Sequence, residues 1–350
     1  MSYTPYSTHE LLGVIRKVPA PSNFWLNLLF RQQVNFQSQY IDFDQIDRGR
    51  RLAPFVAPTV QGKPMKSEGY NTRRFAPAYV KPKHPVDMER LITRRAGEPY
   101  TGNQSLQSRR DAIVGDIMVE QRDMIHRRWE VMAAQAAING AVTVEGEDYP
   151  TQTVDFGRDA NNTVVLSGTN LWSDTTGSDP FKDMETWSLQ MARAGGYPAT
   201  DWVMGTAAWE ALINHPKTDK QLNTDLKNSS QIMLDLGISQ ADENGAIIQL
   251  KGTLGSGIRV WVYSDIYEDE QGNQVEIMDQ NAVVGVNPAG VQGIRCFGAI
   301  MDARAGYQSL EIFPKTWMNE DPSVEYAMSQ SAPLMVPRRP NATFKATVVA

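Results

Sequence analysis

The glycine-rich run over residues 252–257 is the first segment of this sequence whose spacing could support chemistry. It reads Gly-Thr-Leu-Gly-Ser-Gly, and closely spaced glycines let a backbone approach and bind phosphate groups. The run lacks the GxGxxG spacing and the following Lys-Ser/Thr pair, and it lies between two strand-like segments where a phosphate-binding loop would open a helix. We therefore interpret it as a hairpin turn.

Acid–base and metal chemistry need histidines and carboxylates at defined spacings, which this sequence does not provide. His9-Glu10 lacks the second histidine of a zinc-protease helix. The other histidines are scattered, at His84, His126 and His215. We expect His126 on the polar flank of a long helix, and Glu268-Asp269-Glu270, which lacks the ligand rhythm of a calcium loop, at a solvated hairpin tip. We predict no catalytic, cofactor-binding or metal-ligating residue, and hence no enzyme.

The composition is that of a soluble protein with a buried core. Of its 350 residues, 41% are hydrophobic, which is ordinary for a globular chain. It contains no run of about 18 apolar residues, and residues 1–16 lack the basic and apolar regions of a signal peptide. Cys296 is the single cysteine, so it can form no internal disulfide and suits a reducing compartment. We expect a cytoplasmic protein that makes no contact with a membrane.

The two ends of the chain carry opposite charge. Residues 1–110 hold 17 Lys and Arg against 8 Asp and Glu, or +9, which leaves 17 basic and 32 acidic residues, or −15, for the remainder. A basic N-terminal part could bind nucleic acid, or it could lie on the acidic body of a second copy of the chain. We favour the second interpretation because the basic residues form no dense block and no nucleic-acid-binding motif accompanies them.

A long amphipathic helix is predicted over residues 105–140, where apolar residues recur at the helical period of three or four. These residues are Ile113, Val114, Ile117, Met118, Met124, Ile125, Met132 and Ala136. Ser105 or Ser108 is a candidate N-cap, and Asn139-Gly140 tolerates the left-handed conformation that ends a helix. Its length of about 45 Å requires a surface to lie along. We interpret it as the beam that joins a basic N-terminal part to a mixed body.

The N-terminal part has two features. In residues 1–40, Ser7 and Glu10 have the spacing of a capping box at the start of a short helix. The apolar run over residues 24–30 either packs on its own domain or docks on a partner, and both alternatives remain open. Residues 50–95 then have the alternation and the prolines of an extended β ribbon, which has little core of its own and needs a surface to lie on.

Residues 141–350 read as a mixed body of the α+β class. A hairpin is predicted over 141–155, Asp179-Pro180 is expected to begin a helix that Gly195-Gly196 ends, and Thr206 is expected to cap a helix over 207–214. Residues 217–236 also look helical. Strand-like runs lie at 201–204, 246–250, 258–263, 274–278, 282–286, 294–301, 325–335 and 343–349. We assign α+β because helices and strands are mixed without a regular βαβ rhythm.

Several short motifs occur in one order along the chain. The clearest are Ala-Tyr-Val-Lys-Pro-Lys-His over residues 78–84 and Gln-Ser-Ala-Pro-Leu-Met over residues 330–335. Further motifs lie at residues 24–31, 53–58, 154–158 and 313–317. Together they resemble the major capsid protein of lambda-like tailed phages, the major head protein E family. The matches are collinear over nearly the whole chain, so we regard the resemblance as specific.

The resemblance implies the Hong Kong 97-type phage capsid fold. The segments would be an N-terminal arm (1–48), an extended β loop (49–96), the spine helix and flanks of a peripheral domain (97–150), a mainly axial domain (151–310) and a C-terminal return to the peripheral domain (311–350). The implied function is that of a major capsid protein of a tailed double-stranded DNA phage or prophage. Its location would be the virion.

The resemblance also implies the partners. Copies of the chain would form hexamers and pentamers of an icosahedral shell that encloses double-stranded DNA, without sequence-specific binding, at its inner face. A separate scaffold protein, a portal protein and a possible trimeric decoration protein would take part, and no cofactor is implied. The alternatives are an encapsulating shell of the same fold with cellular cargo, and a soluble enzyme such as a hydrolase.

Basic and aromatic residues of the N-terminal part are the candidates for contacts between subunits, because arginine pairs well with carboxylates of a neighbour. The candidates are Phe24, Trp25, Phe30, Arg50, Arg51, Phe55, Lys63, Lys66, Arg73, Arg74, Tyr79, Lys81, Lys83, Arg94, Arg95, Arg109 and Arg110. For the arginines of the long helix the plainer alternative is a solvent face with partners one turn away, such as Asp123 with Arg127.

Overall fold

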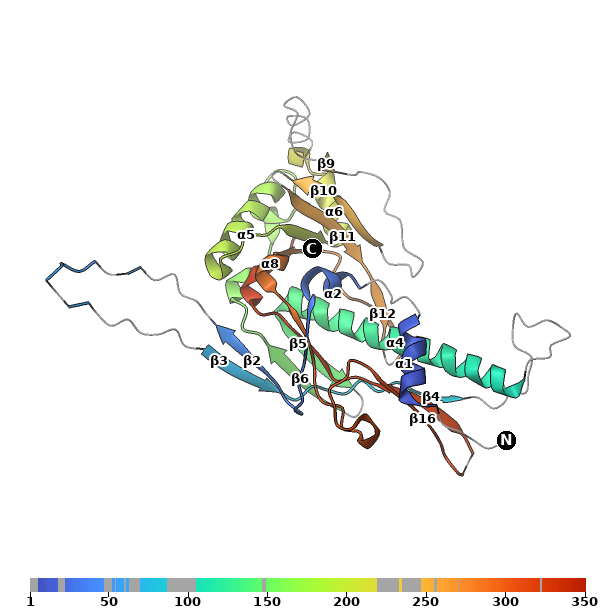
Figure 1. Ribbon diagram of the computed structural model, residues 1–350. Helices are drawn as coiled ribbons and strands as arrows, with labels where there is room; N and C mark the ends of the chain where they lie inside the picture. The colour runs from blue at the N-terminus through green and yellow to red at the C-terminus, as the bar shows by residue number, and fades with distance from the viewer. Residues whose placement is uncertain are drawn as a thin grey trace.

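The computed structural model describes residues 6–17, 23–46, 52–53, 55–59, 61–62, 70–86, 105–146, 149–218, 233–234, 247–254, 257–269, 271–321 and 323–350. Within these ranges the long helix is α4 (Leu106–Asn139), which crosses the middle of the molecule (Figure 1). Ser105 is its N-cap and accepts the N–H of Ser108, and Gly140 ends it in the left-handed conformation with φ 67°. Both ends are as the sequence predicts. We call α4 the spine helix.

The two halves of the spine helix are buried differently. From Trp129 to Ile138 every side chain except Gln135 is buried, whereas the first half is buried along one side. Met124, predicted on the apolar side, is 51% exposed. His126, predicted on the polar flank, is half-buried with its ring 4.5 Å from that of Trp129. The helix is therefore a core element at one end and an amphipathic surface element at the other.

The N-terminal segment packs back on the spine helix. In α1 (Thr8–Lys17) the predicted capping box is present, with Ser7 N–H donating to Glu10 at 2.9 Å and Glu10 N–H to Ser7 Oγ at 3.3 Å. Helix α2 (Phe24–Leu29) is buried along almost its whole length. After it, β1 (Gln32–Asn35) pairs in parallel with β15 (Ile294–Phe297), which pairs with β18 (Pro333–Val336). The N-terminal segment is thus an integral part of the body, through helix packing and strand pairing.

A two-stranded ribbon projects from one side of the body (Figure 1). It consists of β2 (Ile41–Ile46) and β3 (Tyr70–Phe75), paired antiparallel from Ile41 opposite Phe75 to Ile46 opposite Tyr70. The predicted ribbon is confirmed, but its paired part differs from the prediction: the first strand lies before residue 50, and the described residues between 52 and 62 are not in strands. Proline alternation there favours extended chain without a strand partner.

A seven-stranded mixed sheet forms the upper body in Figure 1, with the order β7-β19-β14-β8-β11-β10-β9. Its strands are β7 (Thr163–Val165), β8 (Asp201–Met204), β9 (Met233–Leu234), β10 (Ile247–Leu254), β11 (Ile258–Ser264), β14 (Ala282–Val286) and β19 (Thr343–Thr347). Successive residues of β14 face opposite sides. Val284 joins the main core around the spine helix, and Val283 joins a second core with Trp172, Trp187 and Phe344 beneath α5 (Pro180–Gly195) and α6 (Thr206–Ile213).

Most local predictions in this body are confirmed. Asp179 caps α5 by accepting the N–H of Lys182, and Gly196 ends it in the left-handed conformation. Thr206 is the first residue of α6 instead of its cap, which is Gly205. In the predicted helix over 217–236, residues 233–234 form strand β9, and residues 219–232 and 235–236 lie outside the described ranges. Residues 217–218 are helical, as predicted, whereas the prediction is wrong at residues 233–234.

The remaining strands form small sheets along the lower body. A three-stranded sheet has the order β16 (Phe313–Met318), β17 (Glu325–Gln330) and β4 (Lys83–Val86). Predicted hairpins are present as β5 (Ala141–Gly146) with β6 (Tyr149–Asp155) and β12 (Ile266–Glu268) with β13 (Gln274–Glu276), and the glycine-rich run joins β10 to β11. A short helix, α8 (Pro288–Val291), precedes β15. The class is α+β, as predicted.

The C-terminal residues serve two parts of the structure. Strands β17 and β18 pack against the spine helix and β16 pairs with β17, whereas β19 returns to the seven-stranded sheet between β7 and β14. The boundary at residue 311 therefore does not separate β19 from the strands of residues 151–310. The division into arm, loop, peripheral and axial segments stays a proposal, with β19 reassigned to the segment of the large sheet.

Gly140→Ala should lower the free energy of unfolding by about 1–3 kcal/mol, because an L side chain is strained in the left-handed region. Its Cβ would also lie 2.7 Å from Cβ of Arg158. Gly115→Ala in the same helix is the matched control, since an added Cβ there meets nothing within 4 Å, and it should stabilise the helix by up to about 1 kcal/mol. Urea unfolding of the unassembled subunit measures both, and equal effects would contradict the assigned cap.

Candidate assembly surfaces

A buried carboxylate of the spine helix fixes the N-terminal segment. Glu130 is 3% exposed and accepts the backbone N–H of Trp25 at 2.7 Å and of Leu26 at 3.1 Å. These N–H groups belong to the first turn of α2 and have no partner within that helix, and Asn23 makes no capping hydrogen bond. Glu130 therefore caps α2 from 105 residues away in the sequence. Sequence reasoning missed it, although a single acid within the apolar run 129–134 was a signal.

The electrostatics around this cap follow from burial. Burial raises the pKa of Glu130 to about 7, against the opposing effect of the two N–H donors. Burial also lowers the pKa of the neighbouring His126 to about 4, and its Nδ1 lies 3.2 Å from the side-chain amide of Asn23. Burial thus favours the uncharged forms of both Glu130 and His126, at the point where the N-terminal segment packs on the spine helix.

The apolar run over residues 24–30 packs inside its own chain. Phe24, Trp25 and Phe30 are 9%, 0% and 0% exposed. The ring of Phe24 lies 5.3 Å from those of Trp261 and Tyr263 on β11. Of the two alternatives left by the sequence, self-packing is the one observed. These three side chains have little surface left for a neighbouring subunit.

Arg110 is also engaged within the chain. Its guanidinium forms a bidentate pair with Glu325 on β17, with N···O distances of 2.8 and 2.9 Å, and the two side chains are only 14% and 7% exposed. Tyr6 lies beneath the same guanidinium, 4.5 Å from ring centre to Cζ, and its hydroxyl donates to Asp111. Arg110 therefore fastens the start of the spine helix to the lower sheet. Arg109 is half-buried beside it.

At the base of the ribbon, one arginine joins its two strands and another joins it to the body. Arg74 on β3 makes a bidentate pair with Asp42 on β2, at 2.8 and 3.2 Å, which lowers the pKa of that carboxyl. Arg73 donates to the backbone carbonyl of Asp155 at the end of β6. Both contacts are exposed to solvent, so each contributes little to stability. Only the Arg73 contact links the ribbon to the body.

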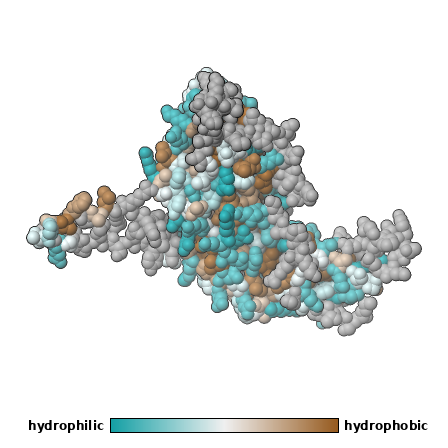
Figure 2. All heavy atoms as spheres, turned by 45° about the horizontal axis from the view of Figure 1, so that its top comes forward, coloured by the Kyte–Doolittle hydropathy of each residue, from teal (hydrophilic) through white to brown (hydrophobic). Residues whose placement is uncertain are grey.

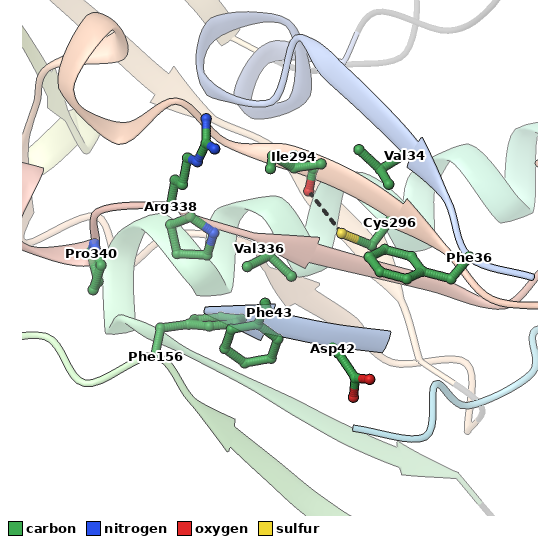
Figure 3. Close-up of a pocket in the computed structure, with 11 residues that line it drawn as sticks. Val34, Phe36, Asp42, Phe43, Phe156, Ile294, Cys296, Val336, Arg338 and Pro340 are labelled. Carbon is green, nitrogen blue, oxygen red and sulfur yellow. Dashed lines mark hydrogen bonds between the residues drawn. The ribbon is translucent and has the colours of Figure 1, made fainter. Parts of the chain in front are cut away.

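A cavity of about 220 Å³ lies beneath the ribbon base (Figure 3). Ile294, Cys296 and Val336 of the β1-β15-β18 sheet lie on one side, and Phe43 of the ribbon, with its ring 5.8 Å from that of Phe156, lies on the other. Burial raises the pKa of Cys296 to about 12, so the thiol stays neutral. The base of the ribbon thus packs over the β1-β15-β18 sheet incompletely and leaves a cavity between them.

The described residues 52–53, 55–59 and 61–62, which we call the ribbon tip, are almost wholly exposed. Leu52 is 92% exposed, Val56 is 42% exposed and Phe55 is fully exposed. Figure 2 shows apolar side chains gathered at this end, far from the body. A group of large apolar side chains in water is typical of a surface that another molecule covers.

A groove of about 1190 Å³ runs along the exposed half of the spine helix, beside β12 and β13. Its apolar residues are Val80, Val119, Met124, Val131 and Ile266, and its acidic residues are Asp116, Glu120, Asp123 and Glu268. Arg127 in this groove pairs with Asp265 at 3.5 Å, and Asp123 pairs with Arg122 at 2.6 Å. The pair of Asp123 with Arg127 is therefore not formed, because Asp123 pairs with the adjacent Arg122 and Arg127 reaches Asp265 outside the helix. We call this surface the spine groove.

Lysines and aromatic rings share the outer face of the β16-β17-β4 sheet. Lys83 lies 3.9 Å above the ring of Tyr326 and 5.3 Å from that of Trp317, and the two rings stack at 5.7 Å. Lys315 lies 5.3 Å from Trp317, and Lys81 lies 4.7 Å from Tyr79. We call Lys81, Lys83, Lys315, Trp317 and Tyr326 the lysine face. Three candidates, Tyr79, Lys81 and Lys83, thus come together.

Six of the other contact candidates lie outside the described ranges. They are Arg50, Arg51, Lys63, Lys66, Arg94 and Arg95. Within those ranges the structure contains no group of three or more His, Cys, Asp or Glu side chains that could hold a metal ion. No helix of the described part is both long and apolar enough to cross a membrane.

Comparison with known proteins identifies the kind of molecule to which these surfaces belong. A family model described as phage major capsid protein E matches residues 7–348. The chain belongs to this family. It is 31% identical over 337 residues to the major capsid protein of Enterobacteria phage P21, with 95% of each chain covered, and 28% identical over 337 residues to that of Escherichia phage lambda, again with 95% of each covered.

Solved structures agree with the family on the fold. A crystal structure of a capsid protein of a prophage of Escherichia coli CFT073 matches with a TM-score of 0.74 and 23% identity, covering 99% of this chain and 100% of the other. The mature capsid of bacteriophage PhiM1 matches with a TM-score of 0.50 and 10% identity, covering 94% and 88%. The fold is the Hong Kong 97-type capsid fold that the sequence resemblance implied.

Membership of the capsid protein E family settles the class of function. The protein is a major capsid protein of a tailed double-stranded DNA phage or prophage, located in the virion, and it is a structural protein and not an enzyme. The hydrolase alternative and the shell with cellular cargo are thereby set aside.

The stability of the unassembled subunit should depend on pH through Glu130. Its folded pKa of about 7 lies above the ordinary 4.5, so its contribution is full below the unfolded pKa and is lost as pH rises through 7. Glu130→Gln does not titrate. The advantage of wild type over this variant in unfolding free energy should therefore shrink between about pH 5 and about pH 8, by up to about 1.4 kcal/mol per unit.

Urea unfolding of both proteins over that range measures the difference, and His126 titrates in both and cancels. Glu120→Gln, which removes an exposed carboxylate from the same helix, controls for the change of charge. A difference between wild type and Glu130→Gln that is constant with pH would contradict the buried cap.

Proposed function

We propose that this capsid protein assembles head to tail into rings, the hexamers and pentamers of an icosahedral shell, in which the ribbon of one subunit lies in the spine groove of the next. The observation that carries the proposal is the ribbon tip, whose apolar side chains have no core of their own. A ribbon of two strands is at best marginally stable alone. Docking on a neighbour would bury it and couple its ordering to assembly.

Charge complementarity supports this choice of surface. Residues 49–66 of the ribbon hold Arg50, Arg51, Lys63 and Lys66 and no acidic residue. The spine groove offers an apolar floor with four carboxylates, those of Asp116, Glu120, Asp123 and Glu268, against the two arginines Arg127 and Arg128, so its acidic residues outnumber its basic ones. A basic apolar segment and an acidic apolar groove match in both respects, and opposite potentials fix register and speed encounter.

The arrangement of the two surfaces supports ring formation. The ribbon leaves the body on one side, whereas β12 and the first half of the spine helix lie toward the other (Figure 1). A contact between two different surfaces of one molecule is heterologous and closes into a ring when its rotation permits. Six or five copies would then share one type of contact with small changes of angle.

The proposal extends to the rest of the particle. A separate scaffold protein would direct shell size, a portal protein would replace one pentamer, and a trimeric decoration protein would bind the outer surface of the shell. The net charge of −6 suits a wall that encloses DNA without binding each phosphate. Arg73 and Arg74 at the ribbon base, and Phe55 at its tip, are the described contact candidates retained for the ring.

Assembly of the purified wild-type chain should weaken with salt, because part of the contact is between exposed charges that ions screen. Sedimentation velocity with negative-stain microscopy of the fast fraction measures it. We expect rings or shells at about 50 mM salt and a shift toward subunits at about 500 mM. Assemblies that are unchanged across this range, or a monomer at every salt concentration, would contradict a charge-assisted ring contact.

Phe55→Ser should raise the concentration needed for ring formation by about tenfold to a hundredfold, because a fully exposed phenyl ring would lose about 1.5–3 kcal/mol of burial in the groove. The subunit itself should unfold as the wild type does, since this side chain is fully exposed and buries no surface against the described part of its chain. Val165→Ser, which removes a 72% exposed side chain from β7, is the control and should assemble normally. Normal assembly of Phe55→Ser would remove the ribbon tip from the contact.

A further inference from the structure

Two lysines of the lysine face have no ion-pair partner among the residues that the structure describes. Lys81 and Lys83 are exposed, and they make no ion pair with any residue in the described ranges. Lys315 pairs with Asp302. Lys83 is held over two aromatic rings, which orients its ammonium group toward solvent instead of leaving the side chain free.

The face is regular because three strands present alternate residues. Across β16, β17 and β4, Lys315 lies opposite Met328, which lies opposite Lys83, and Trp317 lies opposite Tyr326 in the next row. The intervening residues point the other way and are buried against the spine helix, as Ala327 is at 0% exposure. One side of this sheet is thus fixed in the core, and the other presents a flat apolar surface with lysines.

The hairpin that joins β16 to β17 carries the opposite charge at its end. Glu320 and Asp321 are both exposed there, and they too make no ion pair within the described ranges. The backbone of the hairpin is closed by the Asn319 N–H, which donates to the Val324 carbonyl at 2.9 Å. We call residues 319–321 and 323–324 the acidic tip.

We propose that the lysine face binds the acidic tip of a second copy of this chain, as a contact separate from the ribbon. The face offers ammonium groups and stacked rings, and the tip offers two exposed carboxylates at the end of a hairpin. Because β16 and β17 run from the lysine face to the tip, the tip extends away from the face of its own chain. The ammonium groups of the face and the carboxylates of the tip can therefore pair with each other between two copies of the chain.

Charge distribution favours a second copy over DNA as the occupant. A phosphate backbone would pair with Lys81 and Lys83, but the same molecule would meet Glu320 and Asp321 of the same hairpin and be repelled. Two copies satisfy the lysines of one and the carboxylates of the other. The contact is heterologous, so it closes around a rotation axis, and because it uses no ribbon residue it can join one ring to another.

Charge exchange tests the contact in the full-length chain. Lys83→Glu alone, and Asp321→Lys alone, should each raise the concentration needed for shells by about tenfold while rings persist. The double variant that carries both substitutions should restore shells to within about threefold of the wild type. Sedimentation velocity distinguishes rings from shells. Single variants that form shells as the wild type does, or a double variant that is no better than either single one, would overturn the proposal.

Disulfide trapping provides a second test that does not require shells and keeps every charge in place. Ser323→Cys at the tip and Pro85→Cys on β4 are made in separate chains, which are mixed and oxidised. Cys296 is 2% exposed and should not react. We expect a covalent dimer in the mixture, at several times the yield of a control mixture of Ser323→Cys with Val165→Cys.

The outcomes separate this inference from the ring proposal. A trapped dimer without rings would support the lysine face and count against the ribbon contact. Rings without a trapped dimer above the control would overturn the lysine-face proposal alone. A short DNA duplex that binds wild type but not Lys83→Glu, again with no trapped dimer, would assign the face to packaged DNA and overturn the second-copy contact.

Discussion

Burial of the spine helix on all sides of its second half is the constraint on which the other elements depend. Ten residues from Trp129 to Ile138 must be covered, and nine of them are buried. Helix α2 and strands β5, β18 and β19 supply that cover. The first half needs cover on one side only, which leaves a groove with an apolar floor. A single helix thus builds the core of a subunit at one end and a surface for assembly at the other.

The N-terminal segment is attached by an interaction of a different kind. Two N–H groups at the start of α2 are buried, and leaving them unpaired would cost about 1–3 kcal/mol each. Glu130 pairs them at the cost of burying a carboxylate, which is why its pKa rises to about 7. The arrangement gives the segment a fixed orientation. Its apolar side chains are buried within the subunit and are not available to a neighbouring subunit. Contacts between subunits therefore fall to residues farther along the chain.

Local signals in the sequence predicted the local structure well. Ser105, Gly140, Asp179 and Gly196 marked helix ends correctly because capping depends on residues within one turn. What could not be predicted is which distant elements meet. Arg127 pairs with Asp265 and not with its helical neighbour, and the strands of the ribbon begin before its prolines. The lysine face was foreseen only as separate lysines, since its rings come from strands more than 200 residues away.

The parallel pairing of β1 with β15 bears on the order of events while the chain is being made. Gln32 lies opposite Ile294, so the first strand has no partner until most of the protein has left the ribosome. At about 5–20 residues per second this interval lasts roughly 15–60 s. During that time α2 can already pack on the spine helix, which is synthesised earlier, but Phe24 still lacks the rings of Trp261 and Tyr263 on β11. The N-terminal segment is therefore only partly covered until residues near the end of the chain have been made.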